Sequence, residues 1–183
     1  MAEPIRTLRT QVSGLWKLRH VVFEGDEQLG VLTVTRNGWG MVTAGEYRPE
    51  KGEVLYLRRD PGLLRAQFSI WTDEREWLGS SLRWATMKRQ IDLWTGGKPY
   101  RIVPLPGLRR GWRMVATKTG EVARVEYGLF GRGATLKIFR KTDFELLLFA
   151  YFLGAMVLSE SIFPTSLDPI ESAPQKAPEP SKA

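Results

Sequence analysis

Hydrophobic and polar residues alternate in short runs over most of this chain. Trp16 and Leu18 alternate with Lys17 and Arg19 in the first clear run. The same two-residue period recurs at 66–70, 90–93, 112–114 and 135–138, and 121–127 is rich in strand-forming residues. A period of two sends one set of side chains inward and the other into water, which is typical of half-buried strands. The region from residue 15 to residue 139 therefore predicts a mostly β protein.

Turn-forming residues separate these runs. They are Gly25-Asp26, Asn37-Gly38, Asp60-Pro61-Gly62, Gly96-Gly97, Lys118-Thr119-Gly120 and Gly131-Arg132-Gly133. Glycine and asparagine tolerate positive φ, and proline presets φ for a turn. No segment before residue 140 has a helical period. Roughly ten or more short strands at this spacing predict a sandwich or a barrel.

The pattern changes at Thr142. Thr142-Asp143-Phe144-Glu145 fits a capping box, in which Thr142 and Glu145 would each accept a hydrogen bond from the other's backbone N–H. An unbroken apolar run from Leu146 to Leu158 follows, and Pro164 prevents its continuation. We predict a helix over residues 143–160. The tail, 164–183, is rich in proline, serine, alanine and charge, and we expect it to be disordered because it offers little apolar surface to bury.

A helix that is apolar on every face must be buried in protein or in lipid. The run from Leu146 to Leu158 spans roughly 20 Å at about 1.5 Å per residue, whereas a bilayer core needs about 20 apolar residues. This length favours a helix enclosed by protein, and a closed barrel is the simplest enclosure. The alternative is a tail anchor over 144–163. Lys137, Arg140 and Lys141, which precede the run, would then keep the β domain in the cytoplasm.

These patterns divide the chain into three parts. We predict an N-terminal extension over 1–11, one barrel domain over 12–163 that includes the helix, and the tail over 164–183. The first eleven residues contain Glu3, Arg6 and Arg9 and lack the apolar segment of a secretory signal. A cytoplasmic location is therefore expected.

Four short segments carry a resemblance to a known superfamily. They are Leu29-Gly30, Leu78-Gly79, Thr119-Gly120-Glu121-Val122, and the run from Lys141 to Leu148. Together with the order of short strands before one very apolar helix, they resemble the tubby C-terminal-like superfamily, which includes tubby domains, phospholipid scramblases and LURP-one-related proteins. The resemblance covers residues from about Val12 to Ser159 and is nearest to small bacterial and scramblase-like members. It implies a closed antiparallel β-barrel of about twelve strands around one central hydrophobic C-terminal helix. The long C-terminal tail departs from the compact end usual in the superfamily.

The net charge of the chain indicates which class of binding partner to expect. Lys and Arg number 27 against 20 Asp and Glu, which gives a net charge of +7 and a pI near 9.9. Such a protein is attracted to polyanions. Tubby domains bind phosphoinositides through basic residues on the barrel surface, although no position can be carried over one by one. The candidates for binding anionic headgroups here are the clustered basic residues Arg58, Arg59, Lys88, Arg89, Arg109, Arg110, Arg113, Lys137, Arg140 and Lys141. The alternative is that they are scattered solubility charges.

The sequence contains few residues that would support catalysis or metal binding. The chain has no cysteine and one histidine, His20 in a strand-like segment, so no thiol nucleophile, zinc site or catalytic triad is predicted. No calcium loop occurs, and the glycines from Gly128 to Gly133 do not lead into a helix as a dinucleotide loop would. We expect no enzyme activity, metal or cofactor.

Nucleic acid is the competing polyanion. Arginine and tryptophan interleave at 82–84 and 110–113, but Trp84 and Trp112 fall on the apolar phase of their runs, so we expect both in the core. The sequence thus favours a non-enzymatic lipid-binding or membrane-surface module, cytoplasmic or at the inner face of the membrane. A structural or regulatory domain without a lipid role and a tail-anchored protein are the alternatives. The oligomeric state stays open.

Overall fold

Twelve β-strands and one α-helix make up the computed structural model of the protein. It describes residues 3–14, 17–38, 41–60, 67–82, 90–106, 110–128 and 133–154. The elements are β1 (Arg6–Ser13), β2 (Leu18–Glu24), β3 (Glu27–Arg36), β4 (Val42–Pro49), β5 (Leu55–Arg59), β6 (Gln67–Thr72), β7 (Trp77–Leu82), β8 (Ile91–Thr95), β9 (Lys98–Pro104), β10 (Gly111–Ala116), β11 (Gly120–Tyr127), β12 (Gly133–Ile138) and α1 (Phe144–Phe152).

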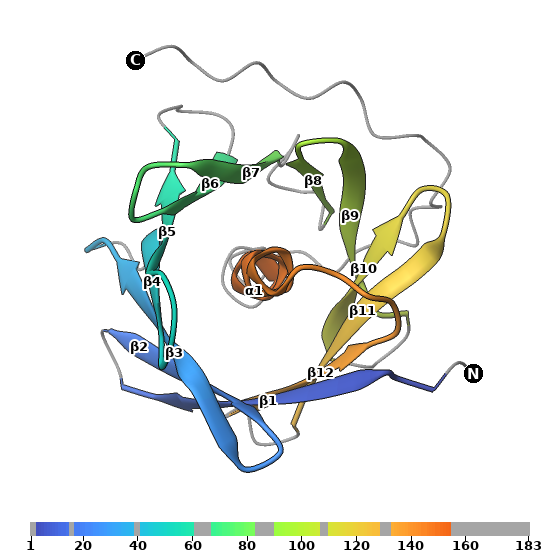
Figure 1. Cartoon of the computed structure of the whole chain (residues 1–183), viewed down its shortest axis with the longest axis horizontal. Helices are drawn as coiled ribbons and strands as arrows, with labels where there is room; N and C mark the ends of the chain where they lie inside the picture. The colour runs from blue at the N-terminus through green and yellow to red at the C-terminus, as the bar shows by residue number, and fades with distance from the viewer. Residues whose placement is uncertain are drawn as a thin grey trace.

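Every strand pairs antiparallel with its neighbours in sequence, and β1 pairs with β12 to close the ring (Figure 1). The closing register runs from Arg6 opposite Ile138 to Gln11 opposite Gly133. The predicted closed antiparallel barrel of about twelve strands is confirmed. The sandwich that the strand pattern also allowed does not form.

The antiparallel order gives the barrel two distinct ends. Even-numbered strands finish, and odd-numbered strands begin, at the end where β12 stops at Ile138 and the chain passes into α1. We call this the helix end. Odd-numbered strands finish at the opposite end, which we call the far end.

Alternation along the strands builds the core. Leu8, Leu32, Leu57 and Met114 are buried in the barrel interior, whereas outward neighbours such as Arg9 are exposed. Trp112 is buried, as its apolar phase predicted, and Trp84 lies outside the described residues. Burial of apolar surface on this scale is the main stabilising term of the fold.

The barrel begins earlier than the predicted boundary at residue 12. Residues Arg6 to Ser13 form β1, which closes the ring, so most of the predicted N-terminal extension belongs to the domain. The pattern concealed this strand because one of its buried inward residues is polar. Thr10 accepts a hydrogen bond from the Ala134 backbone N–H at 3.1 Å, which compensates for the burial of its hydroxyl.

Figure 1 looks into the barrel and shows α1 surrounded by the strands. Leu146 to Phe152 are all buried, and the Phe152 ring meets Phe68 of β6 edge-on at 5.3 Å between centroids. Leu153 and Gly154 continue α1 in a wider, π-type turn. A β-carbon on Gly154 would overlap the indole ring of Trp112, so the helix approaches the wall here with no room for a side chain.

The predicted capping box does not form. Asp143 is the N-cap residue, without a side-chain capping bond, and the Thr142 hydroxyl donates instead to the Arg140 carbonyl at 3.1 Å. The helix begins one residue later than the motif requires, so Glu145 is the second helical residue rather than the third. Glu145 still suits this position, since an acid in the first turn interacts favourably with the helix dipole.

Within residues 3–154, apart from the gaps, no helix is long and apolar enough to cross a membrane. The predicted anchor over 144–163 and the predicted helix end at 160 extend past Gly154, outside the described residues. The predicted tail over 164–183 lies outside them too.

Candidate functional site

Seven basic residues lie at or near the far end of the barrel in the described chain. Each of them lies at the far end of a strand or close to it. They are Lys17, Arg19, Arg36, Arg58, Arg59, Arg110 and Arg113. We call them the far-end basic set. Arg59 and Arg113 are half-buried, and the other five are exposed. The site is therefore a set of cations spread around one end of the barrel rather than a pocket.

The far-end basic set is electrostatically uncompensated. None of its members forms an ion pair with a described residue. Of the described acids of this half, only Asp60 keeps a charge that no cation matches. Asp60 accepts the Ser69 hydroxyl at 2.7 Å, Asp92 pairs with Arg101 at 2.9 Å, and Glu126 pairs with Lys137 at 2.6 Å. The positive field at the far end is thus available to an external anion.

Strand alternation presents Arg58 to solvent. Leu55 and Leu57 of β5 point into the core, so Tyr56 and Arg58 face outward. The Arg58 guanidinium lies 5.4 Å from the centre of the Tyr56 ring, a cation–π contact that orients it without neutralising its charge.

Arg113 differs from Arg58 because it is half-buried. It lies between buried Trp112 and Met114 on β10 and therefore points outward. Its Nε is buried and has no hydrogen-bond partner among the described residues. A guanidinium N–H in this condition favours an acceptor, and phosphate and carboxylate oxygens are the strongest ones available.

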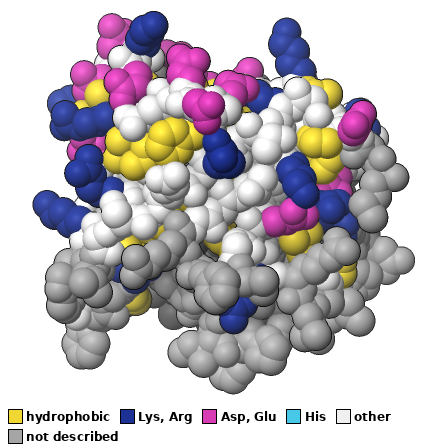
Figure 2. Space-filling model, turned by 90° about the horizontal axis from the view of Figure 1, so that it is seen from below, with side chains coloured by type: hydrophobic (Ala, Val, Ile, Leu, Met, Phe, Trp, Pro, Cys, Tyr) yellow, Lys and Arg dark blue, Asp and Glu magenta, His cyan; other side chains and the backbone are white. Residues whose placement is uncertain are grey.

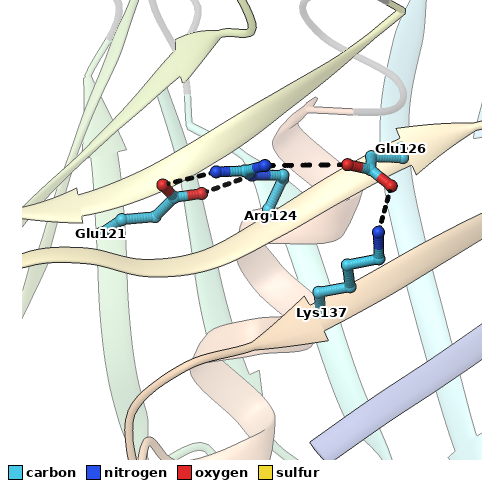
Figure 3. A network of polar contacts seen from close by, with 4 residues as sticks. All are labelled: Glu121, Arg124, Glu126 and Lys137. Carbon is cyan, nitrogen blue, oxygen red and sulfur yellow. Dashed lines mark hydrogen bonds and ion pairs between the residues drawn. The ribbon is translucent and has the colours of Figure 1, made fainter. Parts of the chain in front are cut away.

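The remaining predicted basic residues lie elsewhere. Lys137 belongs to a network on β11 and β12, shown in Figure 3. Arg124 donates twice to Glu121, at 2.6 and 2.9 Å, and approaches Glu126 at 3.8 Å. Lys137 donates to the other oxygen of Glu126, so its charge is matched within the wall.

Arg140 and Lys141 are exposed between β12 and α1, at the helix end. Lys88, Arg89 and Arg109 lie outside the described residues. The predicted residues therefore do not all share one patch. Of the seven that the structure describes, Arg58, Arg59, Arg110 and Arg113 lie together at the far end. Lys17, Arg19 and Arg36 join them, although these residues do not form adjacent basic pairs in the sequence. Only the strand register shows that they share an end.

The helix end has the opposite character. Its described turns and strand ends contain the acids Glu24, Asp26, Glu27, Glu50, Glu53, Asp73, Glu74, Glu76, Asp143 and Glu145, interspersed with fewer cations. Figure 2 views the barrel from the side and shows Asp and Glu side chains concentrated along its upper edge. The described part of the barrel is thus polarised along its axis, and such an uneven charge distribution orients a protein in an external field.

A polar cluster lies inside the barrel. Tyr151 of α1 hydrogen-bonds to Nδ1 of His20 at 2.8 Å and to the Thr10 hydroxyl at 3.0 Å. Burial, with a smaller contribution from Arg36, lowers the pKa of His20 to about 4, and burial raises the pKa of Tyr151 to about 12. Both side chains are therefore neutral near pH 7. His20 is only 2% exposed, so this cluster fixes the helix against the wall rather than meeting a substrate.

The described residues contain no group of three or more His, Cys, Asp or Glu side chains that could hold a metal ion. Comparisons with protein-family models, with curated proteins and with solved structures found no match for this chain. The resemblance to the tubby C-terminal-like superfamily therefore stays a prediction.

Proposed function

We propose that this protein is a non-enzymatic module that binds anionic phospholipid membranes through the far end of its barrel. The observation that carries the proposal is the unpaired state of the far-end basic set. Elsewhere in the described barrel, Arg6, Arg124 and Lys137 each have a carboxylate partner, and the unpaired cations of the helix end, Lys51, Arg75, Lys118, Arg140 and Lys141, lie among the acids of that end. Seven cations without partners at one end favour an external polyanion.

The arrangement of these cations suits a plane better than a small anion. They lie in three places around the barrel: on β2 and β3 and at Lys17 just before β2, on β5, and on β10 and at Arg110 just before it. Around the ring, two strands lie between β2 and β5, four between β5 and β10, and three between β10 and β2. One phosphate group cannot reach three such positions, whereas a flat anionic surface meets them together. Each basic residue near an anionic leaflet contributes about 1 kcal/mol, so several are needed for stable contact.

We further propose that α1 is the central hydrophobic axis of the barrel and not a lipid anchor. Leu146 to Leu153 are buried, and Tyr151 and Phe152 contact side chains of the wall. The membrane contact then depends on surface charge alone, which makes binding reversible and sensitive to salt. A closed twelve-stranded barrel with such a helix supports the tubby-like assignment, and a cytoplasmic location at the inner membrane face follows from it as part of the proposal.

Vesicle flotation tests this function. The far-end variant Arg19→Gln/Arg36→Gln/Arg58→Gln is compared with a helix-end variant, Lys118→Gln/Arg140→Gln/Lys141→Gln, which loses the same number of exposed charges. We expect the wild type and the helix-end variant to float with phosphatidylserine-containing vesicles but not with pure phosphatidylcholine. The far-end variant should bind roughly 100-fold more weakly, from about 1 kcal/mol per residue.

Two outcomes would contradict the proposal. Equal losses in both variants would show that net charge alone drives association. Equal binding to neutral and anionic vesicles, or binding to neither, would favour a structural or regulatory domain without a lipid role.

A further inference from the structure

A cavity of about 590 Å³ lies at the helix end, beside the first turn of α1. Its apolar lining comes from both the wall and the helix: Leu29, Leu55, Ile70, Leu78, Phe144 and Leu146. Cavities that bind small molecules occupy roughly 300–1,000 Å³ and combine an apolar lining with a few polar groups. This cavity meets both conditions, and it lies at the opposite end from the proposed membrane surface.

Tyr47 is one of the polar groups that line the cavity. Its side chain is 2% exposed, yet its hydroxyl has no hydrogen-bond partner among the described residues. A β-carbon on Gly30 would lie 2.6 Å from the hydroxyl oxygen, so glycine at this position makes room for it. Buried hydroxyls are normally paired, and this one is available to a ligand.

The charges at the cavity favour a cation. Glu53, Asp143 and Glu145 line it, and the lining cations are Arg6 and Lys51. Arg6 is already committed, because it donates twice to Glu24, at 2.6 Å each, and lies over the Phe144 ring at 5.8 Å.

The acids of the first helical turn also stabilise the helix dipole. Glu53 precedes β5 and has no such role. After the pairing of Arg6, three carboxylates face one lysine. Tyr47 and Phe144 add aromatic surface, with their ring centres 5.6 Å apart.

We propose that this cavity binds a small organic cation: an apolar body that carries a protonated amine. The apolar body packs against Leu55, Ile70 and Leu78, and the ammonium group lies near Glu53 and Glu145. One ammonium N–H is donated to the Tyr47 hydroxyl oxygen. This ligand satisfies the unpaired hydroxyl and the excess carboxylates together, which neither a neutral nor an anionic amphiphile does.

Three probes with the same chain length separate head-group charge from apolar packing: octylamine, octanol and octanoate. Each is titrated into the full chain by calorimetry, with changes in the amide NMR spectrum as a second readout. We expect saturable octylamine binding that is at least about tenfold tighter than octanoate binding, with octanol between them. Octanoate binding as tightly as octylamine, or no saturable binding of octylamine, would overturn the proposal.

Matched variants locate the site. Glu53→Gln/Glu145→Gln should weaken octylamine binding about tenfold and leave octanol binding unchanged. The control Glu27→Gln/Glu74→Gln removes two exposed acids of the same end that do not line the cavity, and it should bind octylamine like the wild type. Tyr47→Phe keeps the ring and should weaken octylamine binding severalfold. Equal effects of the two double variants would show diffuse attraction and would refute a defined site.

Discussion

The hydroxyl of Tyr151 on α1 lies 2.8 Å from Nδ1 of His20 on β2, which ties the helix to the barrel wall by a hydrogen bond. Thr10 of β1 joins the same hydroxyl at 3.0 Å. Apolar contacts alone would allow the helix to rotate or slide along its axis. A polar contact of this kind fixes one arrangement, because any other leaves buried polar groups without partners.

Tyr151→Phe should therefore destabilise the protein although it keeps the ring. Loss of the hydroxyl leaves Thr10 and His20 with fewer partners, at a cost of about 1–3 kcal/mol. Urea unfolding at pH 7 measures the change. Tyr56→Phe, on the outer face of β5, is the control and should change stability by less than about 0.5 kcal/mol. A Tyr151→Phe protein as stable as this control would show that the contact contributes nothing.

His20 should make stability depend on pH. Its pKa is about 4 in the folded protein and 6.5 in an unfolded chain, so between these values the unfolded state binds the extra proton. The stabilisation is fully present above pH 6.5 and is lost as pH falls towards 4, to a total of about 3 kcal/mol. Urea unfolding from pH 4 to pH 7 should show a shallower pH dependence in His20→Gln than in the wild type. Parallel curves for the two proteins would contradict this assignment.

Gly154→Ala tests the close approach of α1 to β10. The added β-carbon would overlap the indole of Trp112, and overpacking of this kind costs about 1–3 kcal/mol. Gly96→Ala is a suitable control, since a β-carbon there meets nothing within 4 Å. Thermal unfolding followed by tryptophan fluorescence should show a lower midpoint for Gly154→Ala alone. Equal midpoints would mean that the helix lies farther from the wall.

Leu148→Asp tests the burial of the helix. Leu148 is 3% exposed, and an unpaired carboxylate at this position should abolish cooperative unfolding in detergent-free buffer. Leu148→Met nearly conserves volume and should cost less than about 1.5 kcal/mol. A folded, soluble Leu148→Asp protein would count against an enclosed helix and in favour of the anchor alternative.

Local patterns in the sequence predicted most of the barrel. Alternation marked strands such as β10 and β12 because one face of each is buried, and the apolar run after Thr142 marked the helix. β1 was not predicted because Thr10, which points inward, is polar, and its partners Ala134 and Tyr151 are 124 and 141 residues away in sequence. The capping box failed because it depends on the residue at which the helix begins, and tertiary packing can shift that point by one residue.

The candidate site was harder to predict than the fold. The clusters of basic residues in the sequence pointed to Arg58, Arg59, Arg110 and Arg113, which the structure places at the far end. They could not show that Lys137 is matched by Glu126 from the adjacent strand. Nor could they find the cavity beside α1, because its lining comes from several strands and the helix, and these meet only when the ring closes.

The pairing of β1 with β12 also governs how the protein is made. β1 is synthesised before the other eleven strands and β12 after them, and α1, which the strands surround, emerges after both. Until α1 is synthesised, the apolar inner side chains of the strands lack the helix residues that belong to the same core cluster. Contacts over such sequence distances form slowly and leave apolar surface open to aggregation. A chain that stops before residue 144 would lack α1 and its buried side chains, and we expect it to be less stable than the full chain.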